Sequence, residues 1–74
     1  MKGLEFEQRV RRLGALTGAH VCFVCHGRGN LGRLYYGGRF TTLQDRKQDI
    51  GKGLLWAMCR QLGISLEDLL RVGQ

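Results

Sequence analysis

The chain has 74 residues and a net charge of +6, with twelve Lys and Arg against six Asp and Glu. This length predicts one domain over residues 1–74 with a thin core, and no apolar run is long enough to cross a membrane. Acids near the N-terminus, where a signal peptide has its apolar stretch, argue against secretion. Three cysteines make a poor disulfide framework, so a reduced, cytoplasmic protein is expected.

The positive charge is concentrated in one part of the chain. Eleven of the twelve cations but only four of the six acids fall within residues 1–60, and Arg outnumbers Lys nine to three. Guanidinium groups favour planar, bidentate contacts with phosphate, so nucleic acid is the leading inference for a partner. A solvated basic surface without a ligand is the alternative.

The first predicted element is a helix over residues 4–13. Phe6, Val10 and Leu13 recur on one stripe, which indicates a face packed on a core. Gly14 and then Gly18 are expected to end this helix.

Residues 20–26 alternate as a strand does. Val21, Phe23 and Cys25 are expected to face the core. An imidazole can take or give a proton near neutral pH, but two at the ends of this strand would stand roughly 20 Å apart and could not act on one phosphate. The residues expected to face outward are His20, Cys22, Val24 and His26.

The cysteines of this strand suggest a rival hypothesis. Residues 22–26 match the c-type haem attachment pattern, but that chemistry needs export and an accessible loop rather than an alternating strand. A zinc site fails because Cys22 and Cys25 would point to opposite faces, with no second pair to complete four ligands. We therefore expect no metal and no cofactor. Cys59, at the edge of a helical apolar face, is most simply a core residue.

Two further strands are predicted at residues 33–36 and 39–43, with Gly37-Gly38 between them as a hairpin signal. Of Tyr35 and Tyr36, one is expected to pack inward and the other outward.

Two helices follow. Asp49 can cap a helix over residues 50–62, with Gly63 as its stop, and Ser65 can cap a last short helix. The expected apolar face of the longer helix is Leu54, Leu55, Met58 and Leu62. The whole order predicts an α+β fold with an antiparallel sheet packed on helices.

Trp56 falls opposite that apolar face, among cations. An exposed Trp there would suit a partner protein or a stacked base. The alternative, slightly favoured for so small a core, is that the C-terminal helix folds back and covers it.

Several cations are candidates for phosphate contacts. Lys52 lies in the first turn of a helix, between glycines and beside free backbone N–H groups. Arg46 and Lys47 extend this positive patch, although a solvated helix start explains those two better. His26 with Arg28 either contacts a nucleic-acid backbone or merely ends the strand.

Three segments, in this order and spacing, resemble the HicA-type toxins, the mRNA-cleaving partners of HicA–HicB toxin–antitoxin pairs. They are residues 18–20 (Gly-Ala-His), 26–28 (His-Gly-Arg), and 49–55 leading into 58–65. The resemblance implies a double-stranded-RNA-binding-domain-like fold, α-β-β-β-α, here with a short extra C-terminal helix. It also implies a metal-independent endoribonuclease whose catalytic residue is His20, silenced by a HicB-type antitoxin.

The chain departs from the family pattern at two places. Ala19 stands where the family commonly has Ser, so a hydroxyl hydrogen bond is missing, and the segment between the first strand and Phe40 is long. His20 also fits an exposed histidine that only binds phosphate. A non-catalytic RNA-binding module of the same fold is therefore the alternative function.

Overall fold

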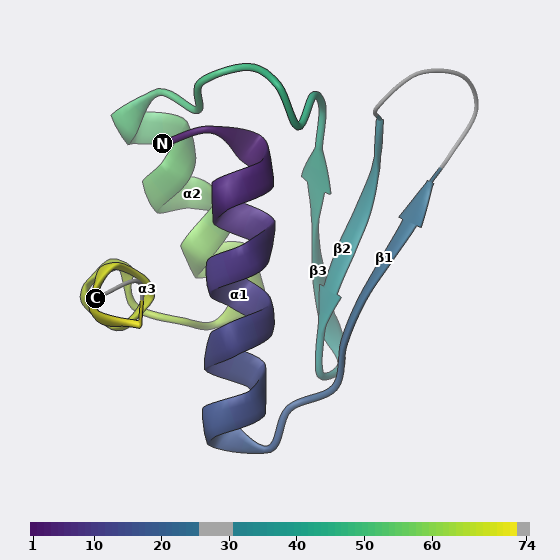
Figure 1. The fold of residues 1–74 in the computed structure, drawn as a ribbon, viewed down its shortest axis with the longest axis vertical. Coiled ribbons are helices and arrows are strands. Elements are labelled where there is room, and N and C mark those ends of the chain that lie inside the picture. The colour runs from purple at the N-terminus through teal and green to yellow at the C-terminus, as the bar shows by residue number, and fades with distance from the viewer. Residues whose placement is uncertain (26–30, 73–74) are drawn as a thin grey trace.

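The computed structural model describes residues 1–25 and 31–72 and has the element order α-β-β-β-α-α (Figure 1). The predicted α+β fold, with its extra C-terminal helix, is confirmed. The predicted contacts of His26 and Arg28 fall outside the described residues. The elements are α1 Gly3–Thr17, β1 Val21–Cys25, β2 Gly32–Tyr36, β3 Arg39–Leu43, α2 Lys52–Leu62 and α3 Leu66–Arg71.

The fold has two layers, with the three helices on one side of the sheet, and within residues 1–25 and 31–72 no helix covers the other side (Figure 1). Between the layers lies one continuous apolar core, to which every element except β1 contributes a buried side chain. Val21 and Phe23 of β1 are partly buried and pack against it. The buried core consists of Phe6, Val10, Leu34, Leu43, Ile50, Leu55, Met58, Cys59, Leu62 and Leu69.

Helix α1 is longer than predicted because it continues through Gly14 and ends only at Gly18, which takes a left-handed conformation. Gly14 is a point of close approach to β1. A Cβ at this position would clash with Val21 Cγ2 and would lie 2.8 Å from the Ala19 carbonyl oxygen. Gly14 therefore sets how near the helix can come to the sheet, and it does not end the helix.

The sheet has the order β1-β2-β3, and both pairings are antiparallel. The predicted hairpin is confirmed, with Gly37 at a positive φ of 61° in the turn. Tyr36 packs on the core side. Tyr35, its neighbour in β2, faces outward because side chains alternate along a strand.

The expectation that Cys25 packs into the core is wrong, because Cys25 is exposed. Strand alternation still places it on the helix side of the sheet, with Val21 and Phe23. Cys25 is the last residue of an edge strand and pairs with Gly32. The Phe23 ring extends over the backbone of Gly32, so Phe23 fills the space on the helix side at this end of the strand.

Asp49 does not cap α2. The cap position is Gly51, without a side-chain hydrogen bond, and the helix begins at Lys52. Asp49 instead forms an isolated antiparallel bridge with Lys2, and the Ile50 N–H donates to the Met1 carbonyl at 2.7 Å. Pairing with the N-terminal segment keeps these two residues extended and delays the start of the helix.

The buried face of helix α2 also differs from the predicted one. Leu55, Met58 and Leu62 are buried as expected, but Leu54 is 54% exposed, and Cys59 completes the buried face. Trp56 is 54% exposed as well, so the expectation that the C-terminal helix covers it is wrong. Helix α3 packs closer to α1, where Arg9 donates from Nη1 to the Leu70 carbonyl at 2.8 Å.

The ends of the last two helices follow the prediction. Gly63 ends α2 in a left-handed conformation, and the Ser65 hydroxyl accepts a hydrogen bond from the Asp68 N–H at 3.0 Å. Within residues 1–25 and 31–72, no helix has the length and apolar character needed to span a membrane.

Candidate functional site

His20 immediately precedes β1 and is exposed to solvent. Its carbonyl oxygen accepts a hydrogen bond from the Gly37 N–H at 2.8 Å, which extends the β1–β2 ladder by one residue pair. The strand alternation therefore continues through His20 and places it on the same face as Cys22. This face is the one that no helix covers, so the backbone holds His20 at the end of an open surface.

The outer face, as we name the uncovered side of the sheet, carries two cross-strand rows. Cys22, Tyr35 and Phe40 form one row, and Val24, Arg33 and Thr42 form the other. The rings of Tyr35 and Phe40 have centroids 5.6 Å apart and are tilted by 42°. The Arg33 guanidinium lies over the Phe40 ring, 4.8 Å from its centroid.

The outer face carries the positive charge of Arg33, and the described strands contain no Asp or Glu to balance it. The six acids of the chain lie in α1, in the segment between β3 and α2, and in α3. An anion approaching Arg33 therefore meets no carboxylate in the sheet itself.

Sequence reasoning singled out His20 but not Arg33 or Phe40 as candidate site residues. The signal was present, because a two-residue Gly37-Gly38 turn pairs the residues on either side of it. Counting back from that turn places Tyr35 opposite Phe40, and the alternation places both on the face opposite the apolar Leu34.

The structure does not bring Lys52, Arg46 or Lys47 to His20. Residues 44–51 follow Leu43, the last residue of β3. Leu43 pairs with Gly32 and Gly32 with Cys25, so these residues leave the sheet at the end where β1 finishes. That end of the sheet is a full strand length from the start of β1, about 16 Å at ~3.3 Å per residue. The basic patch predicted before α2 and the candidate catalytic histidine therefore lie at opposite ends of the sheet.

Arg46 is engaged inside the fold. Its Nε lies 2.9 Å from Oε1 of Glu7, whose side chain is only 8% exposed. The contact is an ion pair rather than a hydrogen bond. The guanidinium also lies 4.0 Å from the centroid of the Phe23 ring. These contacts favour a structural role for Arg46, whereas Lys47 and Lys52 are exposed.

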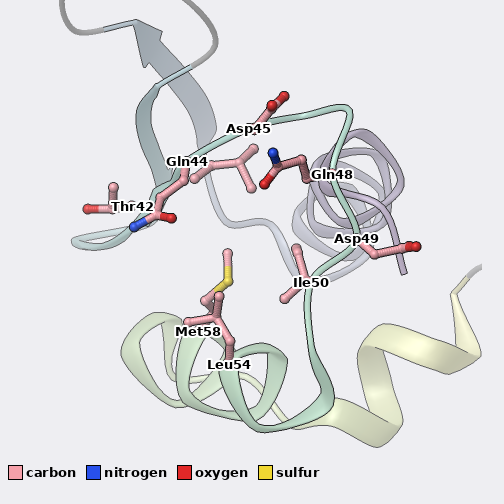
Figure 2. A pocket seen from close by; sticks show the side chains of 9 residues that line it. Thr42, Gln44, Asp45, Gln48, Asp49, Ile50, Leu54 and Met58 are labelled. Carbon is pink, nitrogen blue, oxygen red and sulfur yellow. The ribbon is translucent and has the colours of Figure 1, made fainter.

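A small pocket lies between the end of β3, the following segment and the start of α2 (Figure 2). Its volume is about 100 Å³, below the 300 Å³ or so of ordinary ligand pockets. The Asp45 and Asp49 carboxylates point away from it, and Ile50, Leu54 and Met58 form its apolar side (Figure 2). This hollow is too small for a nucleotide and is not the candidate site.

The residues described here contain no cluster of three or more His, Cys, Asp or Glu that could hold a metal ion. The three cysteines are free thiols, and Cys59 is buried in the core. Burial raises the pKa of the Cys59 thiol, as desolvation disfavours the thiolate.

Comparisons with protein-family models, with curated proteins and with solved structures found no match for this chain.

Proposed function

We propose that the protein is a metal-independent endoribonuclease that cleaves mRNA with His20, the toxin of a pair whose antitoxin is of the HicB type. The observation that carries the proposal is an exposed His20 at the end of an outer face whose strands have no acids. The resemblance of residues 18–20 and 49–65 to HicA-type toxins supports the same function. It is the basis for the cytoplasmic setting, the mRNA substrate and the partner.

The chemistry requires only the RNA and proton transfers. The 2′-hydroxyl oxygen attacks the adjacent phosphorus, and the bond from phosphorus to the 5′-oxygen of the next nucleotide breaks. The products are a 2′,3′-cyclic phosphate and a free 5′-hydroxyl. One proton leaves the 2′-oxygen and one is delivered to the 5′-oxygen, and the imidazole of His20 is suited to perform either transfer near neutral pH. A water molecule performs the other proton transfer.

His20 has the accessibility that this role needs. A strand backbone fixes its position through the hydrogen bond from Gly37, while its side chain is exposed to solvent and to a phosphodiester. Rigid support of an exposed acid–base group favours a reactive geometry. An antitoxin that covers this end of the sheet would remove the access and silence the enzyme.

The test is cleavage of a single-stranded RNA by the wild-type protein and by His20→Ala, with chelator present throughout. We expect about a 10²- to 10⁴-fold loss of cleavage rate in the variant, the usual contribution of a general acid or base. RNA binding and thermal stability should be retained. Leu54→Ala, an exposed change on α2, is the control and should cleave normally.

Equal cleavage by His20→Ala and wild type would contradict the proposal. The second candidate function is a non-catalytic RNA-binding module, favoured by the cation and the aromatic rings of the outer face, which suffice for binding without chemistry. In that case the wild-type protein would bind the RNA and leave it intact.

A further inference from the structure

The outer face carries a feature that the cleavage chemistry does not use. Phe40 is 44% exposed, although a Phe in a thin-cored protein would stabilise the fold better if buried. It lies in the row next to His20, touching Tyr35 on the sheet surface. An exposed ring beside a cation, on a face with no covering element, is suited to contact a partner.

We infer that the outer face binds single-stranded RNA by stacking a base on Phe40 and Tyr35. The base takes the place of the Arg33 guanidinium over the Phe40 ring, and Arg33 pairs with the backbone phosphate. The inference rests on the proposed function for the identity of the polymer, and it extends that function by naming the strand state and the binding surface. Sheet surfaces with exposed aromatic residues bind unpaired bases in this way in other nucleic-acid-binding folds.

Three observations favour an unpaired RNA strand as the occupant. The first is charge, because the outer face offers Arg33 and the described strands offer no carboxylate to a polyanion. The second is the ring pair, whose centroid separation of 5.6 Å provides a surface about one base wide. The third is Arg33, which lies over Phe40 and presents a planar donor group beside the ring.

Two arginines of the helical layer are less available to a polyanion. Arg9 donates to the carbonyl oxygens of α3, and Arg11 pairs with Glu7 Oε2 at 3.0 Å. Their charges are partly used within the fold, and α1 also carries Glu5. A duplex, whose bases are already stacked and paired, has no free base to place on Phe40, so the outer face selects single strands.

The molecule contains a matched control for this surface. Trp56 is also an exposed aromatic residue, at 54%, and Arg60 lies over its ring at 5.4 Å from the centroid. This second aromatic–arginine pair is on α2, in the helical layer. Comparing Phe40 with Trp56 separates stacking on the outer face from a general effect of exposed aromatic residues.

The experiment measures binding of a 2′-O-methyl single strand of about ten nucleotides, within the usual site size, by fluorescence anisotropy. The methyl group blocks the attacking hydroxyl, so affinity is read without cleavage. We expect Phe40→Ala to weaken binding about 5- to 100-fold, the usual range for one stacked base. Trp56→Ala should stay within about twofold of wild type, and the matching duplex should bind more weakly than the single strand.

Phe40→Leu keeps apolar area but removes the aromatic ring, and it serves if Phe40→Ala fails to fold. Weak RNA binding by a folded Phe40→Leu supports stacking. Wild-type binding by that variant would overturn the inference and would favour an apolar protein partner for this face. A larger loss in Trp56→Ala than in Phe40→Ala, or tighter binding of the duplex, would also overturn it.

The two proposals fail in distinguishable ways. If His20→Ala abolishes cleavage while the Phe40 variants bind RNA like wild type, the ribonuclease function stands and the stacking surface is wrong. If the Phe40 variants lose binding while wild-type protein and His20→Ala leave unmodified RNA equally intact, the stacking surface stands and the enzyme function is wrong.

Discussion

Two arginine–phenylalanine pairs in this molecule have nearly the same local geometry and opposite surroundings. Arg46 lies 4.0 Å from the ring centroid of Phe23, on the helix side of the sheet. Arg33 lies 4.8 Å from the ring centroid of Phe40, on the outer face. The two arginines differ in whether a carboxylate balances their charge. Arg46 is ion-paired with the buried Glu7, whereas the described strands supply no carboxylate to Arg33.

This comparison shows what makes an arginine available to an anion. An Arg whose charge is balanced by a buried carboxylate stabilises the fold and offers little to a partner. One that lies on an aromatic ring without a carboxylate keeps its charge and its donors for a ligand. The net charge of +6 is therefore a poor guide to the binding surface, because it counts both kinds alike.

The largest expected difference between the interior and the surface is in cysteine reactivity. Cys59 is 2% exposed and burial raises the pKa of its thiol, while Cys25 is exposed. Since the thiolate is the nucleophile, a raised pKa leaves less of it at a given pH. We expect iodoacetamide to alkylate Cys59 at least about 10³-fold more slowly than Cys25 in the folded protein.

Mass spectrometry of peptides after timed alkylation measures these rates. Urea should remove the difference, because unfolding exposes both thiols. Equal rates in the native protein would show that Cys59 is not buried in solution and would undermine the packing of α2 against the core.

The next largest effect is on stability, from removing the acid that pairs with Arg46. Glu7→Gln keeps the shape of the side chain but ends its ion pairs with Arg11 and Arg46. Both arginines are partly exposed, at 47% and 34%, and retain some solvation. The expected loss is therefore about 1–2 kcal/mol of unfolding free energy, less than for a fully buried pair.

Urea denaturation monitored by circular dichroism tests this value. Glu5→Gln is the matched control, because Glu5 also pairs with an arginine at i+4 but is half exposed. Its expected cost is below about 0.5 kcal/mol. Similar losses in the two variants would mean that the burial of Glu7 makes no energetic difference.

The smallest expected effect is on RNA affinity, from Arg33→Ala. Losing one phosphate contact should weaken binding of the 2′-O-methyl strand about three- to tenfold at low salt, and should reduce the slope of log affinity against log salt by about one. Stability should change by less than about 0.5 kcal/mol, since the side chain is exposed. Arg33→Lys, which keeps the charge, should preserve most of the salt dependence.

An unchanged salt slope in Arg33→Ala would contradict the assignment of this residue to phosphate. The same measurement on Arg46→Ala tests the other arginine of the two pairs. That variant should lose stability while keeping its salt slope, if the charge of Arg46 is already balanced by Glu7.

Local chemistry along the chain determined the order of elements and the faces of the sheet. The 3.6-residue period of Phe6 and Val10, the glycine pair at the hairpin turn and Ser65 at the start of α3 each act within a few residues. The alternation from His20 onward placed the histidine outward for the same reason. These predictions agree with the structure because neighbouring residues are enough to decide them.

Packing between distant segments determines which cations are available and where the candidate residues lie relative to one another. Glu7 and Arg46 are far apart in sequence, and their pairing arises from packing of α1 against the segment after β3. The N-terminal segment holds Asp49 in a bridge and moves the start of α2 to Lys52. Folding separates Lys52 from His20 and brings Arg33 onto Phe40, because strand pairing and core packing join residues that no local pattern connects.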